Sequence, residues 1–140
     1  MKTNTRSLRV YVYAGCDTCR KALRFLQDAG VPHEVVPIRE KPPTLVELKR
    51  VLKATGGEVR RLFNTSGQDY RAMGLGVRLP ELTVDQALAL LAVNGNLVKR
   101  PFVVTSDGGW VGFKADEWKT RTTRSSTLSR TVEGVRSRND

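Results

Sequence analysis

The sequence has very few metal-binding residues and no stretch long enough to span a membrane. Its 140 residues include two cysteines and a single histidine, His33. A tetrahedral zinc site needs about four such ligands, so no structural zinc site within one chain is expected. No apolar run approaches the roughly 20 residues of a membrane span. The polar start, residues 1–6, has no signal-peptide core behind it. We therefore expect a cytoplasmic protein without a bound metal or a membrane segment.

Basic residues outnumber acidic ones, and part of the excess lies near the C-terminus. The net charge is +10, and 39% of the residues are hydrophobic, which suits one globular domain. Residues 119–140 carry six Lys or Arg, two acidic residues and three aliphatic ones. This composition predicts a domain over residues 1–118 and a disordered basic tail over 119–140. A solvated tail is expected, with nucleic-acid binding as the lesser alternative, and the pattern demands no more than a monomer.

The two cysteines lie three residues apart, where a strand-like run gives way to a helix-like run, in the order Cys16-Asp17-Thr18-Cys19. Unpartnered N–H groups and the macrodipole at a helix N-terminus favour a thiolate over a thiol. Cys16 is therefore the candidate nucleophile, and Cys19, one turn further on, is placed to resolve a mixed disulfide. This pattern is typical of a thioredoxin-like redox motif. A structural disulfide across this short loop and two inert buried cysteines remain as alternatives.

Strand-like and helix-like patterns alternate along the chain. Four runs have strand character, at residues 8–13, 33–38, 102–104 and 110–113. A helix over residues 18–29 separates the first two strands, and capping boxes beginning at Thr44 and Thr83 open helices between the second and third. The Gly-rich turn before the last strand predicts an antiparallel hairpin, and a short helix follows from about Ala115. The order predicts an α/β protein with a thioredoxin-like fold, in which a helical insertion follows strand two of a central mixed four-stranded sheet.

The chain resembles the arsenate reductase/Spx family over about residues 8–118. The segments that carry the resemblance occur in the family's order and approximate spacing: Cys16-Asp17-Thr18-Cys19-Arg20-Lys21-Ala22, Pro42-Pro43-Thr44 with Glu47-Leu48, Leu62-Phe63-Asn64-Thr65 with Tyr70 and Gly74-Leu75, Lys99-Arg100-Pro101, and Val111-Gly112-Phe113. In such reductases one cysteine attacks arsenate, three arginines hold the oxyanion, and glutathione or glutaredoxin completes the reduction. The resemblance implies that Cys16 is the nucleophile and that Arg100 is one of the three arginines and stabilises negative charge.

The other two arginine positions of the family correspond to different residues here. One is Asn64, and the other is close to Phe113, where Lys114 is the nearest cation. A cis-proline faces the reactive cysteine in thioredoxin-like folds, which assigns Pro101 to substrate contact. The predicted substrate-binding residues are thus Asn64, Pro101 and Lys114. Each absent charge-assisted contact removes about 1.5–3 kcal/mol of oxyanion binding, so weak arsenate binding is expected.

The second cysteine leaves two classes of function open. The first is a cytoplasmic thiol-disulfide oxidoreductase that uses Cys16 and Cys19, holds no bound cofactor and takes electrons from glutathione or from the glutaredoxin or thioredoxin system. The second follows from the resemblance to Spx-type regulators, in which a thiol/disulfide switch tunes binding to the α subunit of RNA polymerase. The dithiol, Arg100 and Pro101 form one reaction centre, which favours the enzyme.

Overall fold

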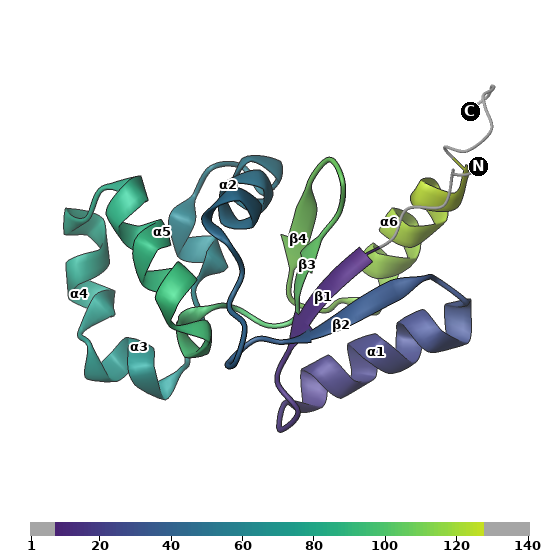
Figure 1. Ribbon diagram of the computed structural model, residues 1–140, viewed down its shortest axis with the longest axis horizontal. Coiled ribbons are helices and arrows are strands. Elements are labelled where there is room, and N and C mark those ends of the chain that lie inside the picture. Colours follow the sequence, from purple (N-terminus) through teal and green to yellow (C-terminus); the bar gives the residue numbers. More distant parts are fainter. Residues whose placement is uncertain (1–7, 128–140) are drawn as a thin grey trace.

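The computed structural model describes residues 8–127 and contains one mixed sheet of four strands, in the order β2-β1-β3-β4 (Figure 1). The strands are β1 (Leu8–Val12), β2 (His33–Pro37), β3 (Phe102–Val104) and β4 (Gly109–Val111). Strand β1 pairs in parallel with β2 and antiparallel with β3, and β3 pairs antiparallel with β4. The predicted mixed sheet and its closing hairpin are therefore confirmed.

Helices cover both faces of this sheet (Figure 1). The α-helices are α1 (Asp17–Ala29), α2 (Leu45–Ala54), α3 (Gln68–Ala72), α4 (Leu75–Arg78), α5 (Val84–Val93) and α6 (Ala115–Thr127). Short 3₁₀ turns occur at η1 (Val59–Leu62), η2 (Leu79–Glu81) and η3 (Gly95–Leu97). Elements α2 to η3 form the predicted helical insertion between β2 and β3. Both predicted capping boxes are present, at Thr44 with Glu47 and at Thr83 with Gln86.

Two hydrophobic clusters lie on opposite faces of the sheet. Side chains alternate along a strand, so Val10 joins the cluster beneath α1 and α6, whereas Tyr11 joins the cluster beneath α2 and the insertion. Trp118 of α6 is fully buried in the first cluster, and its indole N–H donates to the Gly112 carbonyl over 3.0 Å. The two middle strands, β1 and β3, thus carry core side chains, and the segments that leave their ends lead to the cysteine motif and to the hairpin with β4.

Helix α6 continues past the predicted domain boundary at residue 118. Thr122 is buried one turn beyond Trp118, and the Arg121 guanidinium lies 5.2 Å from the centre of the Trp110 ring. This packing explains why residues 119–127 are helical where a disordered tail was predicted. The rest of the predicted tail, residues 128–140, lies outside the described residues. No helix within residues 8–127 is long and apolar enough to cross a membrane.

A buried carboxylate ties α2 to β1. Glu47 is 6% exposed and accepts hydrogen bonds from the Tyr11 hydroxyl at 2.6 Å, the Arg9 guanidinium at 2.7 Å and the Thr44 amide at 3.0 Å. Burial alone would raise the pKa of Glu47, but the bonds from Tyr11, Thr44 and Arg9 outweigh burial and hold that pKa below its usual value. The ionised form of Glu47 therefore stabilises the fold.

Glu47→Gln is expected to lower the free energy of unfolding at neutral pH by about 2 kcal/mol, because an amide nitrogen would face donors. A carboxylate whose pKa is lowered on folding stabilises the protein above the pKa of the unfolded chain, and this stability is lost as the pH falls through the folded-state pKa. The difference in the free energy of unfolding between variant and wild type should thus become smaller below a pH of about 4. Urea unfolding of both proteins at neutral pH and at a pH below about 4 measures this difference in the free energy of unfolding. Glu34→Gln, which removes only an exposed partner of Arg9, is the control, and equal differences at the two pH values would contradict the assignment.

Candidate active site

The two cysteines occupy the start of α1, as predicted, and both are free thiols. Cys16 is the N-cap residue, and its Sγ accepts a hydrogen bond from the Cys19 amide at 3.4 Å. Its own amide donates to the Tyr13 carbonyl at 3.0 Å, which fixes the turn between β1 and α1. Cys16 is half-buried, whereas Cys19 is only 1% exposed. A substrate can therefore reach the first sulfur and not the second.

Cys19 is held as a thiol by its surroundings. Burial raises the pKa of Cys19 to about 12, and its hydrogen bond and charge interaction with Cys16 add to the rise. A backbone hydrogen bond from Tyr13 and the positive charge of Arg100 act in the opposite direction and lower this pKa. The positive charge of Arg100 thus favours the ionised form of the buried sulfur.

Two arginines lie against the aromatic ring that precedes the cysteine motif. The guanidinium carbon of Arg100 is 5.3 Å from the centre of the Tyr13 ring, and that of Arg39 is 4.6 Å from it. Such cation-π contacts hold guanidinium groups in a defined position. Arg39 comes from the connection between β2 and α2, far from Arg100 in sequence. Tyr13 therefore acts as a platform that gathers positive charge beside the start of α1.

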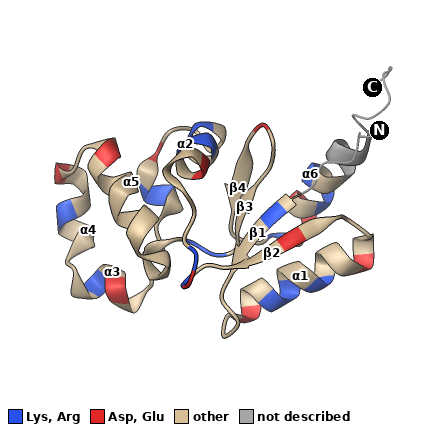
Figure 2. Cartoon of the chain, viewed as in Figure 1, with Lys and Arg blue, Asp and Glu red and all other residues tan. Residues whose placement is uncertain are grey.

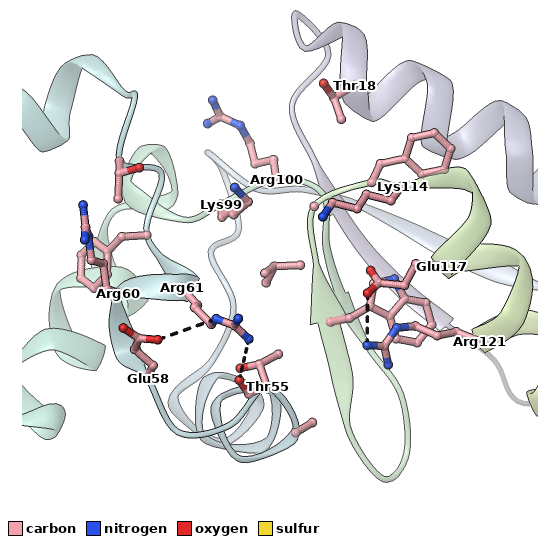
Figure 3. A pocket seen from close by; sticks show the side chains of 17 residues that line it. Thr18, Thr55, Glu58, Arg60, Arg61, Lys99, Arg100, Lys114, Glu117 and Arg121 are labelled. Carbon is pink, nitrogen blue, oxygen red and sulfur yellow. Dashed lines mark hydrogen bonds and ion pairs between the residues drawn. The ribbon is translucent and has the colours of Figure 1, made fainter.

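A wide cleft of about 770 Å³ extends from the cysteine motif between α2 and η1 on one side and β4 and α6 on the other (Figure 3). Thr18 is the residue of the motif that lines the cleft, and neither cysteine does. In Figure 3, Lys99 and Lys114 lie below Thr18, whereas the Arg100 side chain points upward to the left of it. The Lys99 stem lies over Gly112, where a Cβ atom would be 3.3 Å from Lys99 Cε. The backbone of Gly112 has φ +76, so both space and conformation favour glycine there.

Positive charge dominates this cleft. Six basic residues and two acidic ones line it: Arg60, Arg61, Lys99, Arg100, Lys114, Arg121, Glu58 and Glu117. Both carboxylates are paired, Glu58 with Arg61 at 3.8 Å and Glu117 with Arg121 at 3.7 Å (Figure 3). Figure 2 shows basic residues in the segment that leads into β3, which contributes Lys99 and Arg100 to this lining. The lining therefore has four more positive than negative charges, and it suits an anionic ligand.

The structure brings together only some of the predicted substrate-binding residues. Arg100 and Lys114 line the cleft. Pro101 is buried behind it, follows a cis peptide bond, and accepts a hydrogen bond from the Gly112 amide at 2.9 Å. Asn64 is not among the lining residues, although Phe63 and Thr65 on either side are. The Asn64 side chain instead lies against Gly67, where an added Cβ would be 2.7 Å from Asn64 Nδ2.

Sequence reasoning missed Arg39, Arg60 and Arg61 as residues near the site, and it gave Tyr13 no role. The position of Tyr13 three residues before Cys16 was the one signal that could have pointed to the platform. Arg39 had no such signal, because it reaches the ring only through the packing of the β2-α2 connection. Within residues 8–127, no group of three or more His, Cys, Asp or Glu side chains could hold a metal ion.

Comparison with known proteins relates this arrangement to one family. The chain is 39% identical to the uncharacterized protein YusI of Bacillus subtilis, over 81% of this chain and 96% of YusI. It is 28% identical to the global transcriptional regulator Spx of Listeria innocua, over 77% of this chain and 81% of Spx. The solved arsenate reductase from Vibrio cholerae superposes with a TM-score of 0.70 at 27% identity, over 81% of this chain and 95% of that one. The model of the ArsC family matches residues 11–121, and the chain belongs to this family.

Proposed function

We propose that the protein is a thiol-disulfide oxidoreductase in which Cys16 attacks the substrate and Cys19 resolves the intermediate. The observation that carries the proposal is the pairing of a half-buried N-cap Cys16 with a fully buried Cys19 one turn further on. Two inert structural cysteines would not need one of the pair to be reachable. The nearby guanidinium of Arg100 supports a site that handles negatively charged sulfur.

In the first step the Cys16 thiolate attacks one sulfur of a substrate disulfide. A bond forms between Cys16 Sγ and that sulfur, the substrate S–S bond breaks, and the second substrate sulfur leaves as a thiolate. The Cys19 amide, which donates to Cys16 Sγ at 3.4 Å, holds this sulfur at the start of α1. The product is a mixed disulfide on Cys16.

In the second step Cys19 attacks Cys16 Sγ and gives up its proton, the bond between Cys16 and the substrate sulfur breaks, and the departing substrate thiolate takes up the proton, which leaves a Cys16–Cys19 disulfide. Two effects that raise the pKa of Cys19 come from Cys16 itself. Both disappear when Cys16 is covalently bound, while the lowering effects of Arg100 and the Tyr13 backbone remain. Formation of the mixed disulfide thus removes part of what raises the pKa of Cys19, while burial, the largest cause, remains.

The cycle closes when an external thiol reduces the Cys16–Cys19 disulfide. Two electrons are needed, from a dithiol such as a glutaredoxin or a thioredoxin, or from two glutathione molecules. Arsenate is the alternative first substrate implied by family membership. With Asn64 at one arginine position of the family and the other close to Phe113, where Lys114 is the nearest cation, we expect arsenate to bind weakly compared with a disulfide.

A second candidate function is an Spx-like redox switch without turnover. The similarity to Spx regulators and the two free, closely spaced cysteines of this chain favour this candidate. In that case the Cys16–Cys19 disulfide would change affinity for a partner, and the resemblance implies the α subunit of RNA polymerase. A cytoplasmic location suits either candidate.

The test is turnover of purified full-length protein in a glutathione and glutaredoxin coupled assay, with a glutathionylated peptide and, separately, arsenate. Turnover of the peptide supports the oxidoreductase. Absence of turnover on both substrates, together with redox-dependent binding to the RNA polymerase α subunit, would favour the switch.

Arg100→Gln should raise the pKa of Cys19 and move the pH dependence of the resolving step to higher pH, whereas a purely structural Arg100 would leave that profile unmoved.

A further inference from the structure

The cleft runs across an unpaired edge of the sheet. Strand β4 is last in the order β2-β1-β3-β4, and only β3 pairs with it in the described part of the chain. Trp110 packs with the cluster under α6, and Val111 packs with the cluster under α2. Both residues line the cleft. A cleft lined from both faces of a sheet at its last strand must pass over the open edge of that strand.

The backbone groups at this edge point outward. The Gly112 amide donates to the Pro101 carbonyl at 2.9 Å, and the Thr105 amide donates to the Gly108 carbonyl at 3.1 Å. Hydrogen-bonded and non-hydrogen-bonded pairs alternate along an antiparallel ladder. Trp110 is therefore bonded to β3, whereas the amide and carbonyl of Val111 face away from β3. An extended polypeptide can pair with such an edge by strand addition.

Charge decides which polypeptide fits. Lys99 and Lys114 are exposed at one end of the cleft, near Thr18, and neither forms an ion pair with another residue of the described range 8–127. Segments of this chain outside the described residues do not complement them, because residues 1–7 carry two basic residues and no acidic one, and residues 128–140 carry three basic and two acidic ones. A second copy of a chain with net charge +10 would be repelled. An acidic segment of another protein complements the cleft.

We propose that the cleft binds an extended acidic polypeptide segment along the edge of β4, and that this segment carries the disulfide to Cys16. The inference rests on the proposed oxidoreductase function and names its substrate class. Main-chain bonds to Val111 set the direction of the segment. Lys99 and Lys114 hold its carboxylates, and the end of the cleft at Thr18 brings the next part of the segment to the cysteine motif. A nucleic acid is the competing anionic ligand, but it has no backbone that pairs with a strand edge.

Binding is tested without chemistry, on the full-length Cys16→Ser protein. The probes are a fluorescent peptide with an acidic run on each side of a central serine, and the same peptide with Gln and Asn in place of Glu and Asp. We expect anisotropy to show salt-dependent binding of the acidic peptide. Lys99→Gln combined with Lys114→Gln should weaken binding about fivefold to tenfold. Lys49→Gln, an exposed lysine of α2 outside the cleft, is the matched control and should leave binding unchanged.

Strand addition is tested on the ligand, so that the fold of the protein is not disturbed. Peptides with a methyl group on alternate backbone nitrogens lose the donor on one edge only. One of the two alternating patterns should abolish binding, and the other should retain it. Equal binding by both patterns, equal affinity for the acidic and amide peptides, or displacement of the peptide by a single-stranded oligonucleotide at lower concentration would each overturn the inference.

Turnover separates this inference from the proposed function. Wild-type protein is given the acidic and amide peptides as glutathione mixed disulfides at the central position, where a cysteine replaces the serine. Preferential reduction of the acidic peptide, lost in the double lysine variant, supports both. Equal reduction of the two peptides overturns the acidic substrate class and leaves the oxidoreductase intact. Reduction of neither peptide would count against the oxidoreductase. The anisotropy measurement would still show whether the cleft binds the acidic peptide.

Discussion

Replacing Cys16 by serine is expected to reduce disulfide turnover to the uncatalysed background. The serine hydroxyl is not ionised near neutral pH and does not attack sulfur. Serine is also a favoured N-cap residue, so α1 should be retained. Cys19→Ser should have a different effect, because Cys16 can still form the mixed disulfide but nothing in the chain releases it. Intact-protein mass spectrometry should then show a substrate adduct in Cys19→Ser and none in Cys16→Ser.

The prediction that Cys16 reacts with the substrate before Cys19 is the part that is most easily contradicted. Cys19 is buried and its pKa is raised to about 12, so it should not react first with a substrate. An adduct on Cys19 in the Cys16→Ser protein would reverse the assignment of nucleophile and resolving thiol. Circular dichroism of both variants is the control, since a lost fold would also expose Cys19.

Local features of the site could be predicted from the sequence because they depend on neighbouring residues. The strand-to-helix change around Cys16, the capping boxes at Thr44 and Thr83, and the glycine turn before β4 all use interactions within a few positions. The end of α6 was predicted too early for the opposite reason. Its polar residues past Trp118 look like a tail until the sheet supplies surfaces such as the Trp110 ring.

The cleft could not be predicted because it is made of residues from distant parts of the chain. Arg61 belongs to η1, Lys99 to the segment before β3, and Lys114 to the turn before α6. Which cations face one another depends on how the helical insertion packs on the sheet. The same limit explains Asn64, which alignment with the family put at an oxyanion position and whose side chain lies against Gly67 instead. The net charge of +10 likewise does not show which cations lie together.

Gly95→Ala is expected to destabilise the protein by about 4 kcal/mol or more, or to prevent folding. Gly95 begins η3 and packs directly on the connection between β2 and α2. A Cβ atom there would overlap the Ile38 carbonyl oxygen and lie 2.6 Å from the Ile38 carbonyl carbon. Both atoms belong to the backbone, and Ile38 is fixed by a 2.9 Å hydrogen bond from its amide to the Val12 carbonyl. Urea unfolding of the purified variant measures the loss.

The matched control is the same substitution in a helix. Gly76 lies in α4, where an added Cβ would have only the Tyr70 ring edge near it, at 4.0 Å. Gly76→Ala should therefore stabilise the protein by up to about 1 kcal/mol, because alanine restricts the unfolded chain and favours the helix. Equal effects at the two glycines would contradict the close approach of η3 to Ile38. That approach also matters for the site, because Arg39 follows Ile38 and η3 leads to Arg100. The contact at Gly95 thus brings both arginines to Tyr13, beside the reactive cysteine.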